Sequence, residues 1–461
     1  MQERTLDGIW WTPGAEDAAV GGRLTFSRAD GVRLETIGAL TRENETSLDT
    51  TRLPLIYGTV ASLQTGNDVT LYDATRDSTS SMGRHVKQEF GASSAILGAH
   101  ASTREISRVE VALTQLPQWL VESGFDLEFG EREDFEYRVT HRKLVIPEVA
   151  TPYFQMKIGL RSLPPVTSHR LFPLREEVFL EILPKVPMTF DELHEKYLWR
   201  LQNFLTFATE KASAISWLWG WLPAKEHGVE ILFRHPFESE ATSHPVEMLF
   251  TYRDVSDRLS NLLSKWFELY DVLGPSLNQI FAAIYGEYRH TDTKFLNVIQ
   301  AAESYHRRVN PVSPDVIAAH RARVKRVAEA MDLKDRSWVK GKLKHAYEPA
   351  LAERLFELFT QFGDDFTRPM FATPGELRRS VDEMAEWRNK LTHLTATPEE
   401  IDSALFDLHV FTNQLLTALK ASVLLALGFT AADLESCFRY NQMYRHFARR
   451  RPLETAQSNS A

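Results

Sequence analysis

Residues 384–394 read MAEWRNKLTHL, and this stretch decides which fold is expected for the second half of the chain. Its apolar residues recur at intervals of three and four, as on the buried side of a helix: Met384, Trp387, Leu391 and Leu394. His393 follows Arg388 by five residues, which places it about 140° further around an ideal helix. One regular helix therefore keeps these two side chains apart. A bend near His393, or a second copy of the chain, would be needed to bring them together.

The polar residues of this stretch are suited to cleaving RNA without a metal ion. Histidine titrates near neutral pH, so His393 could take the proton of a 2′-OH or give one to the leaving 5′-oxygen. Arg388 would stabilise the charge that builds on the phosphate, and Asn389 could orient either group. The alternative is structural: Arg388 is a surface residue, and His393 ends a helix, where histidine is favoured.

The composition is that of an ordinary globular protein with room for several domains. The chain has 461 residues, of which 43% are apolar and 25% charged. Its one cysteine, Cys437, cannot form an internal disulfide, which fits a reducing compartment. The N-terminus has no apolar signal-peptide core and no apolar stretch is long enough to span a bilayer. We therefore expect a cytoplasmic protein with no membrane partner.

The net charge of −9 argues against binding nucleic acid over the whole surface. It leaves room for a local basic site, and recognition of RNA needs only that. Three runs are locally basic: HRARVKR at 320–326, VKGKLKH at 339–345 and RHFARRR at 445–451. Such a run is most often a solvated helix face.

The first part of the chain, residues 1–240, is predicted to be a β-rich domain. Apolar and polar residues alternate in short runs separated by Gly, Asp, Asn and Pro, which is typical of antiparallel strands in a sandwich or barrel-like fold. The runs are 22–31, 53–62, 67–75, 107–116, 135–146, 152–162 and 175–185. One helix is inserted near 189–211, where Thr189 and Glu192 form a capping box.

Tryptophans in this region allow two interpretations. Trp217, Trp219 and Trp221 alternate, so a strand would direct all three to one face. Alternating aromatic residues in a strand are usually core, and we expect that here. The alternative is a platform on which a base or a sugar stacks, to which Trp10 and Trp11 could also belong.

Residues 245–450 are predicted to be entirely helical, and residues 452–461 to form a disordered tail. Helical periodicity is found in eight segments: 254–271, 274–289, 293–308, 314–332, 348–362, 374–392, 398–428 and 431–449. The helix at 398–428 begins with a capping box at Thr397 and Glu400, with Pro398 at its first position.

Other chemistries have little support in the sequence. The histidines have neither H-x3-H nor HExxH spacing, and no cysteine cluster exists, so no metal site is expected. A P-loop, a G-x-G-x-x-G motif and a serine nucleophile elbow are all absent. We therefore expect no metal and no cofactor.

The sequence RNKLTH at 388–393 resembles the R-x4-6-H motif of the HEPN superfamily, in its R-N-x3-H form. Upstream, 295–308 resembles the helix of ApeA-like HEPN domains that carries a glutamate followed by a tyrosine and a histidine, here Glu303, Tyr305 and His306. The domain order also resembles ApeA-type proteins, a family associated with bacterial anti-phage defence. The resemblance implies an α+β multidomain fold, with a β-rich N-terminal domain followed by an all-α HEPN helical bundle.

The resemblance also implies a role for each motif residue. HEPN ribonucleases are metal-independent endonucleases that usually work as dimers, with two motifs facing each other in one cleft. Arg388 would hold the scissile phosphate, His393 would be general acid or base, and Asn389 would orient them. Glu303 would pair with Arg388 and His306 would line the cleft, although Glu303 and His306 could instead pair with each other at i, i+3. The products would carry a 2′,3′-cyclic phosphate or 3′-phosphate and a 5′-OH.

In this interpretation the protein is an effector of abortive infection. The N-terminal domain would sense a phage-derived trigger or restrain activity, and the HEPN domain would cleave cellular RNA and stop translation. A structured RNA such as tRNA is the substrate class that the resemblance implies. The alternative is a non-catalytic dimeric module that binds a ligand or RNA and uses its helical domain as a scaffold.

Overall fold

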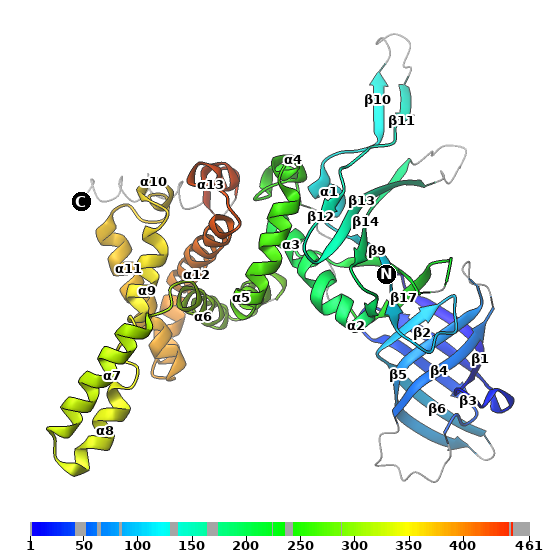
Figure 1. The fold of residues 1–461 in the computed structure, drawn as a ribbon, viewed down its shortest axis with the longest axis horizontal. Helices are drawn as coiled ribbons and strands as arrows, with labels where there is room; N and C mark the ends of the chain where they lie inside the picture. The colour runs from blue at the N-terminus through cyan, green and yellow to red at the C-terminus, as the bar shows by residue number, and fades with distance from the viewer. Residues whose placement is uncertain are drawn as a thin grey trace. The chain divides into compact units, whose positions relative to one another are not determined.

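A computed structural model describes residues 2–41, 52–61, 66–82, 85–129, 137–163, 174–223, 225–235, 243–286, 288–441 and 444–445. The chain forms two compact units, Met1–Ser264 and Lys265–Ala461 (Figure 1). Strands with a few short helices run as far as Phe233, and from there on every regular element among the described residues is a helix. The predicted order of a β-rich region followed by an all-helical region is therefore confirmed. The tail predicted at 452–461 lies outside the described residues.

Six antiparallel strands of the first unit close into a cylinder (Figure 1). They are β1 (Arg4–Trp11), β2 (Val20–Ser27), β3 (Gly31–Ile37), β4 (Arg52–Val60), β5 (Asp68–Met82) and β6 (His85–Ala92). Their order is β5-β4-β1-β2-β3-β6, and β6 pairs back onto β5. Closure in this way leaves none of the six as an unpaired sheet edge.

The sheet continues from β5 into a second, open part. Its strands follow in the order β7 (Ser94–Leu97), β17 (Val229–Phe233), β16 (Ile215–Trp221), β9 (Arg108–Leu113), β14 (Arg175–Pro184), β13 (Phe154–Leu163) and β12 (Val149–Ala150). Two small pairs stand apart, β10 (Phe125–Phe129) with β11 (Tyr137–His141) and β8 (Glu105–Ile106) with β15 (Met188–Thr189). Each of the seven predicted runs of alternation contains a strand.

Short helices complete the first unit. They are η1 (Glu16–Ala18), α1 (Leu116–Leu120), α2 (Phe190–Leu193), α3 (Trp199–Thr209), η3 (Pro245–Glu247) and α4 (Tyr252–Val255), with a π-helical segment, His194–Leu198, joining α2 to α3. The capping box of Thr189 and Glu192 is present at the start of α2. The α2–α3 segment is the helix that the sequence places near 189–211.

Trp10 is the largest side chain buried in the six-stranded cylinder, with no exposed surface. Glycines on the two neighbouring strands make room for its indole: a Cβ on Gly58 would lie 2.3 Å from the ring, and one on Gly22 would lie 2.9 Å from it. Gly58 is the direct cross-strand partner of Trp10. The β1–β4 register therefore depends on glycine at position 58.

The expectation that Trp217, Trp219 and Trp221 are core residues is wrong. They share one face of β16, as alternation requires, but all three are only half-buried. Arginine side chains partly cover the rings: the Arg108 guanidinium lies 3.7 Å from the Trp221 centroid, and that of Arg161 lies 5.9 Å from the Trp217 centroid. Cation–π contact of this kind lets an indole remain at a partly wet surface.

The helices of the second part of the chain are α5 (Leu259–Tyr285), α6 (Thr291–Val309), α7 (Pro314–Glu329), α8 (Leu333–Leu343), α9 (Leu351–Thr360), α10 (Asp364–Thr367), α11 (Pro374–Thr392), α12 (Pro398–Ala426) and α13 (Ala431–Phe438). Helix α6 lies centrally and packs against α9, α11 and α12. None of the helices in the described ranges is long and apolar enough to cross a membrane.

Two helix predictions need correction. The chain was expected to break between 271 and 274, but α5 continues through Pro275. Proline costs about 3 kcal/mol inside a helix, and buried residues on both sides of it, including Trp266, Phe267, Ile280 and Phe281, outweigh that cost. Helix α8 was not predicted, because its apolar residues are too few to mark a stripe.

The end of α11 has an unusual backbone. The N–H of Leu394 donates to the Leu391 carbonyl and that of Thr395 to the Lys390 carbonyl, which is the pattern of a Schellman motif. Leu394 therefore takes a left-handed conformation, with φ of 53°, where glycine is usual. Its side chain is 89% exposed, so Leu394 is not part of the buried stripe predicted for this helix.

Gly58→Ala is predicted to destabilise the first unit by about 1–3 kcal/mol, because the added methyl overlaps the Trp10 ring and forces the strand or the ring to move. The midpoint of urea unfolding measures this. Gly21→Ala is the matched control, since a Cβ there meets nothing within 4 Å. Equal midpoints for the two variants would contradict the packing argument.

Leu394→Gly is predicted to stabilise the second unit by about 1 kcal/mol, because glycine relieves the left-handed strain at the helix end. Thermal unfolding followed by circular dichroism measures the gain. Leu394→Ala removes the same exposed side chain and keeps a Cβ, so it should give no gain. A similar gain for both variants would show that exposure, not backbone strain, is the cause.

Candidate functional site

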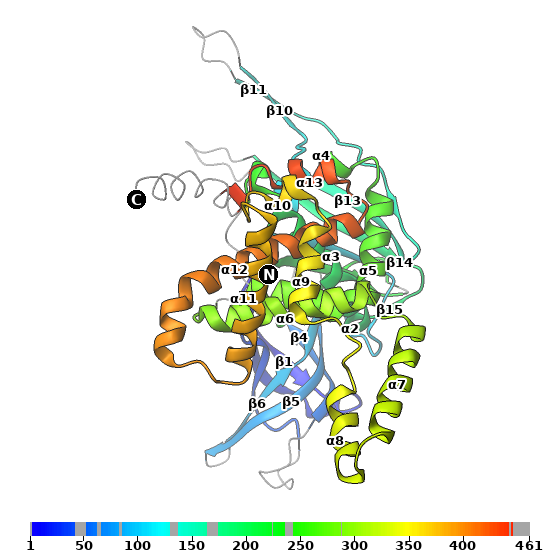
Figure 2. The same cartoon turned by 90° about the vertical axis from the view of Figure 1, so that its left-hand side faces the viewer.

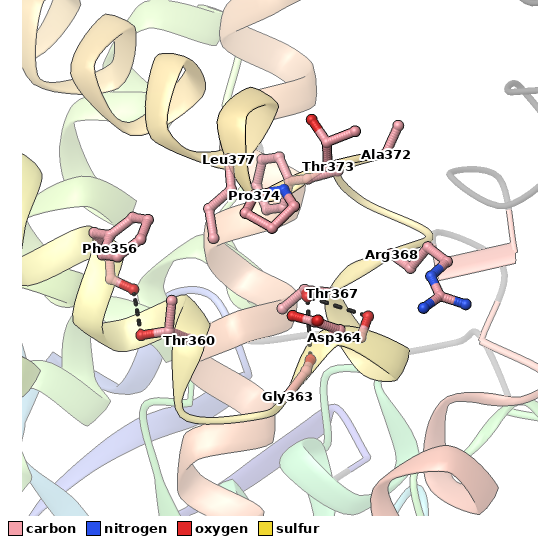
Figure 3. Close-up of a pocket in the computed structure, with 11 residues that line it drawn as sticks. Phe356, Thr360, Gly363, Asp364, Thr367, Arg368, Ala372, Thr373, Pro374 and Leu377 are labelled. Carbon is pink, nitrogen blue, oxygen red and sulfur yellow. Dashed lines mark hydrogen bonds between the residues drawn. The ribbon is translucent and has the colours of Figure 1, made fainter.

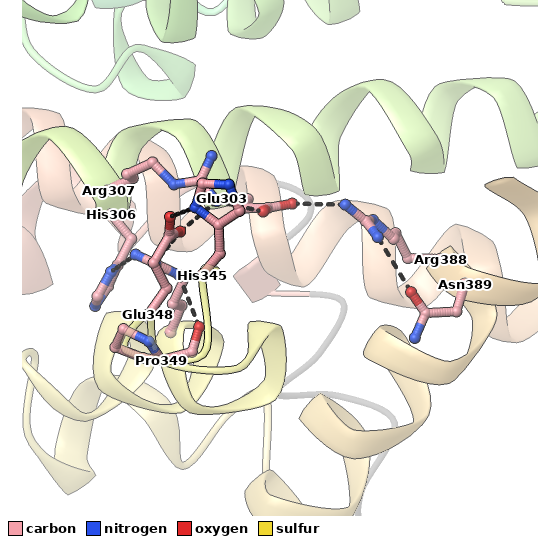
Figure 4. A network of polar contacts seen from close by, with 9 residues as sticks. Glu303, His306, Arg307, His345, Glu348, Pro349, Arg388 and Asn389 are labelled. Carbon is pink, nitrogen blue, oxygen red and sulfur yellow. Dashed lines mark hydrogen bonds and ion pairs between the residues drawn. The ribbon is translucent and has the colours of Figure 1, made fainter. Parts of the chain in front are cut away.

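The candidate site begins with an ion pair between two packed helices. Arg388 lies on α11 and Glu303 on α6, and the Arg388 Nη2 donates to Glu303 Oε2 at 3.0 Å (Figure 4). The two side chains are only 27% and 19% exposed. Helix α6 is held in place by its buried side, which includes Phe295, Val298 and Ile299. The pairing of Glu303 with Arg388 that the resemblance implies is therefore present.

Asn389 contacts Arg388 from the adjacent position on α11. The Arg388 Nη1 donates to Asn389 Oδ1 at 3.1 Å. The Nε–H of Arg388 is buried and has no hydrogen-bond partner in the part of the chain that the structure describes. A guanidinium has five N–H donors. Two are used by Glu303 and Asn389, which leaves donors for a further anionic group.

Glu303 also connects Arg388 to a longer polar network (Figure 4). Its other oxygen, Oε1, accepts from Arg307 Nη2 at 3.1 Å. Arg307 in turn lies 2.9 Å from Glu348, and Glu348 accepts from Arg354 at 3.1 Å. Glu303 thus shares its charge between two arginines, one on its own helix and Arg388 on α11.

Arg354 was not identified from the sequence, although it is 2% exposed and is the largest buried charged side chain among the residues that the structure describes. It donates to the Pro349 carbonyl as well as to Glu348. Arg354 lies one position before Leu355 and four before Leu358 on the buried face of α9. The sequence feature that could have identified Arg354 is its position, as a charged residue, on the apolar stripe of LAERLFELF.

His306 is 2% exposed, and both of its ring nitrogens are engaged. Nε2 lies 2.7 Å from Glu357 Oε2, and Nδ1 lies 3.4 Å from Arg354 Nη1. His306 does not bond to Glu303, its i−3 neighbour, in the described structure. It lines a concavity of about 380 Å³ together with Glu357 and Gln361, and neither Arg388 nor His393 belongs to that lining.

Tyr305, the third residue of the resemblance on α6, is also buried. Its hydroxyl donates to the Ser422 carbonyl on α12 at 3.2 Å. Burial raises the pKa of the Tyr305 phenol to about 12. The phenol therefore stays protonated at neutral pH and joins α6 to α12.

His393 lies at the end of α11 with an exposed side chain. Its backbone N–H donates to the Asn389 carbonyl, so helical geometry continues as far as His393. Within the described ranges no hydrogen bond or ion pair joins its ring to Arg388. The structure of one chain therefore brings Arg388, Asn389 and Glu303 together and leaves His393 apart from them, as the helix geometry predicts.

A small cavity lies at the opposite end of α11 (Figure 3). It measures about 130 Å³ and is lined by residues of α9, α10 and the start of α11, among them Thr360, Thr367 and Leu377. Leu377 and Arg388 are eleven residues apart, or about 16 Å along a helix. The cavity is thus separate from the candidate site, and its volume is below that of usual ligand pockets.

The side chains of the described residues form no group of three or more His, Cys, Asp or Glu that could hold a metal ion. The donors near Arg388 are instead arginines alternating with glutamates. Such a set can bind a phosphate through guanidinium groups. The candidate site therefore has the donors for anion binding.

Comparison with known families agrees with this organisation. Residues 5–266 match the family ApeA N-terminal domain 1, and residues 296–433 match Apea-like HEPN. The second match includes Glu303, Arg388 and His393. No curated protein and no solved structure matches the chain. The chain therefore belongs to the ApeA-like HEPN family, with an ApeA N-terminal domain followed by an Apea-like HEPN domain.

Proposed function

We propose that this protein is a metal-independent endoribonuclease of anti-phage defence that cleaves cellular RNA through Arg388, Asn389 and His393. HEPN domains are generally ribonucleases that dimerise and bind RNA, and this chain carries one. The observation that supports the proposal most is the Arg388 guanidinium. Glu303 and Asn389 hold it in place, while its buried Nε–H is left without a partner in the described structure.

In the proposed reaction the 2′-oxygen of a ribose attacks the neighbouring phosphorus and the bond to the 5′-oxygen breaks. One histidine takes the 2′-OH proton, and another gives a proton to the leaving 5′-oxygen. Arg388 stabilises the negative charge that builds on the phosphate oxygens. The products are a 2′,3′-cyclic phosphate, which can open to a 3′-phosphate, and a 5′-OH. No metal takes part.

A second copy of the chain completes this site in the proposal. One chain supplies one His393, and the reaction uses both a base and an acid. His393 and Leu394 are both exposed at the end of α11, and Leu394 is a large apolar residue with 89% of its surface free. Both residues are therefore accessible to a second copy of the chain. A dimer would thus face two His393 rings across one cleft.

The cellular role extends this proposal. A β-rich domain of residues 1–240 senses a phage-derived trigger or restrains the nuclease, and the helical domain of residues 245–450 cuts RNA. A structured RNA such as tRNA is the proposed substrate, and its loss stops translation in the cytoplasm. His306 supports the site indirectly, through Arg354 and Glu348.

A non-catalytic module that binds a ligand or RNA is the second candidate. The observation in its favour is that Glu303 already neutralises Arg388 in an ion pair. In that function the α6–α11 pair is a structural joint of a dimeric scaffold. The two candidates differ in whether RNA is cut.

The wild type is expected to cut total bacterial RNA in excess EDTA and to leave 5′-OH ends. Arg388→Ala and His393→Ala should each lower the rate at least about 100-fold, because each removes a group that acts on the transition state. Mapping of fragment ends measures this. Arg379→Ala, an exposed arginine on the same helix, is the matched control.

If the wild type is inactive alone, extract from phage-infected cells is added to supply the trigger. Cleavage that then depends on Arg388 and His393 supports a restrained nuclease. RNA that stays intact with and without the extract, while the protein remains folded, would instead establish the scaffold function.

Glu303→Gln is predicted to lower the cleavage rate about tenfold or more, because Arg388 loses the charge that holds its guanidinium in place. The measurement is the single-turnover rate at saturating RNA. Glu353→Gln, which breaks an exposed ion pair with Arg378 and leaves the contacts of Arg388 intact, is the control. A rate that rises in Glu303→Gln would mean that Glu303 restrains Arg388 rather than positions it.

A further inference from the structure

Helices α7 and α8 form a hairpin that projects from the rest of the helical unit (Figures 1 and 2). They pack mainly on each other. Ala328 of α7 and Val339 of α8 are buried between them, whereas most other residues of the pair are exposed. The hairpin thus contributes little to the core of the unit.

The hairpin is strongly basic in an acidic protein. Between Pro314 and His345 the chain has nine Lys and Arg residues and four Asp and Glu residues, whereas the whole chain has a net charge of −9. Seven of the basic side chains are exposed and form no ion pair in the described structure: Arg321, Arg323, Arg326, Lys334, Lys340, Lys342 and Lys344. Elsewhere in the described structure many arginines are paired with acids, as Arg388 is with Glu303.

An exposed tryptophan lies among these charges. Trp338 is 63% exposed, and it lies four residues after Lys334 and four before Lys342. Residues at this spacing lie one above another on a helix face. A free indole between two cations is the arrangement by which proteins stack an unpaired base and bind the phosphates beside it. An acidic protein partner would account for the exposed lysines and arginines, but it would not account for the exposed indole.

Polar contacts fix the hairpin at both ends. At its tip, Arg336 donates to the carbonyls of Glu329 and Met331. At its base, the His320 ring bonds to the Leu343 carbonyl at 2.7 Å and lies against Tyr347. The basic residues are therefore displayed on an ordered arm rather than on a loose loop.

The base of the hairpin leads directly into the network around Arg388. Glu348 follows α8 by five residues and bonds to Arg307, which shares Glu303 with Arg388. The arm is therefore joined, through Glu348 and Arg307, to the network that positions Arg388.

We infer that the α7–α8 hairpin is an RNA-binding arm, whose lysines and arginines bind phosphates and whose Trp338 stacks on an unpaired base. The inference rests on the proposed ribonuclease function, because the arm would hold the RNA that Arg388 and His393 cleave. The arm thereby favours RNA with a single-stranded loop, since a paired base is not free to stack on Trp338.

The test is RNA binding by the full-length protein carrying His393→Ala, so that cleavage does not interfere. The probes are a fluorescein-labelled RNA stem–loop and a duplex with the sequence of its stem, measured by anisotropy over a series of salt concentrations. The hairpin variant changes Lys340, Lys342 and Lys344 to Gln. The matched control changes three exposed lysines outside the hairpin to Gln: Lys143, Lys185 and Lys211.

The hairpin triple variant should bind both probes about 10- to 100-fold more weakly than the control, and its salt slope should fall by about 2–3, as expected for three lost phosphate contacts. Trp338→Ala should weaken binding of the stem–loop about tenfold and leave the duplex unchanged. All these side chains are exposed, so the variants should keep the thermal unfolding midpoint of the control.

Equal binding by the hairpin and control variants, or no RNA binding by either, would overturn the inference. The ribonuclease function would then be tested by the cleavage assay alone. Unchanged RNA binding together with a smaller assembly mass by light scattering would overturn it in favour of a protein-docking arm. Loss of binding in the hairpin variant alone supports it, even if the chelator assay were to find no cleavage.

Discussion

The ion pair between Glu303 and Arg388 is the interaction on which the candidate site depends. It joins α6, the central helix of the helical unit, to α11, which carries the motif. Two charges that are largely shielded from water attract each other strongly, but they stabilise a structure only when geometry and hydrogen bonds compensate for lost hydration. Here Arg307 shares Glu303, and Asn389 accepts from Arg388. The guanidinium is therefore positioned before any ligand arrives.

The same network reaches well beyond the motif. Glu348 accepts from Arg307 and Arg354, and the buried Arg354 lies against His306. A buried arginine is tolerated only where its donors are satisfied, so α9 and the segment before it must keep their places relative to α6. This requirement connects the packing of the bundle to the orientation of Arg388. It also anchors the base of the α7–α8 hairpin. Seven basic side chains of that hairpin are exposed and form no ion pair in the described structure, whereas many arginines elsewhere in it are paired with acids.

The first unit is built on a different constraint, which is the closure of its sheet. Six strands close only if neighbouring registers agree, and the contact between Trp10 and Gly58 fixes one of them. The open part of the sheet then extends from β5 through β7. The half-buried tryptophans of β16 lie on that open part, where Arg108 lies against Trp221 and Arg161 lies near Trp217.

The sequence by itself determined the local structure and the kinds of chemistry available. Periodicity predicted several strands of the first unit and most helices of the second, and the spacing of Arg388 and His393 already implied that one helix keeps them apart. Only the tertiary structure decided which polar groups meet. Glu303 and Arg388 are 85 residues apart in sequence, and no local pattern states that α6 and α11 will pack with these two residues in register. The same holds for buried Arg354, for α5 continuing through Pro275, and for β6 pairing back onto β5. Periodicity depends on neighbouring residues alone, whereas these contacts depend on how many side chains from distant segments pack together at once.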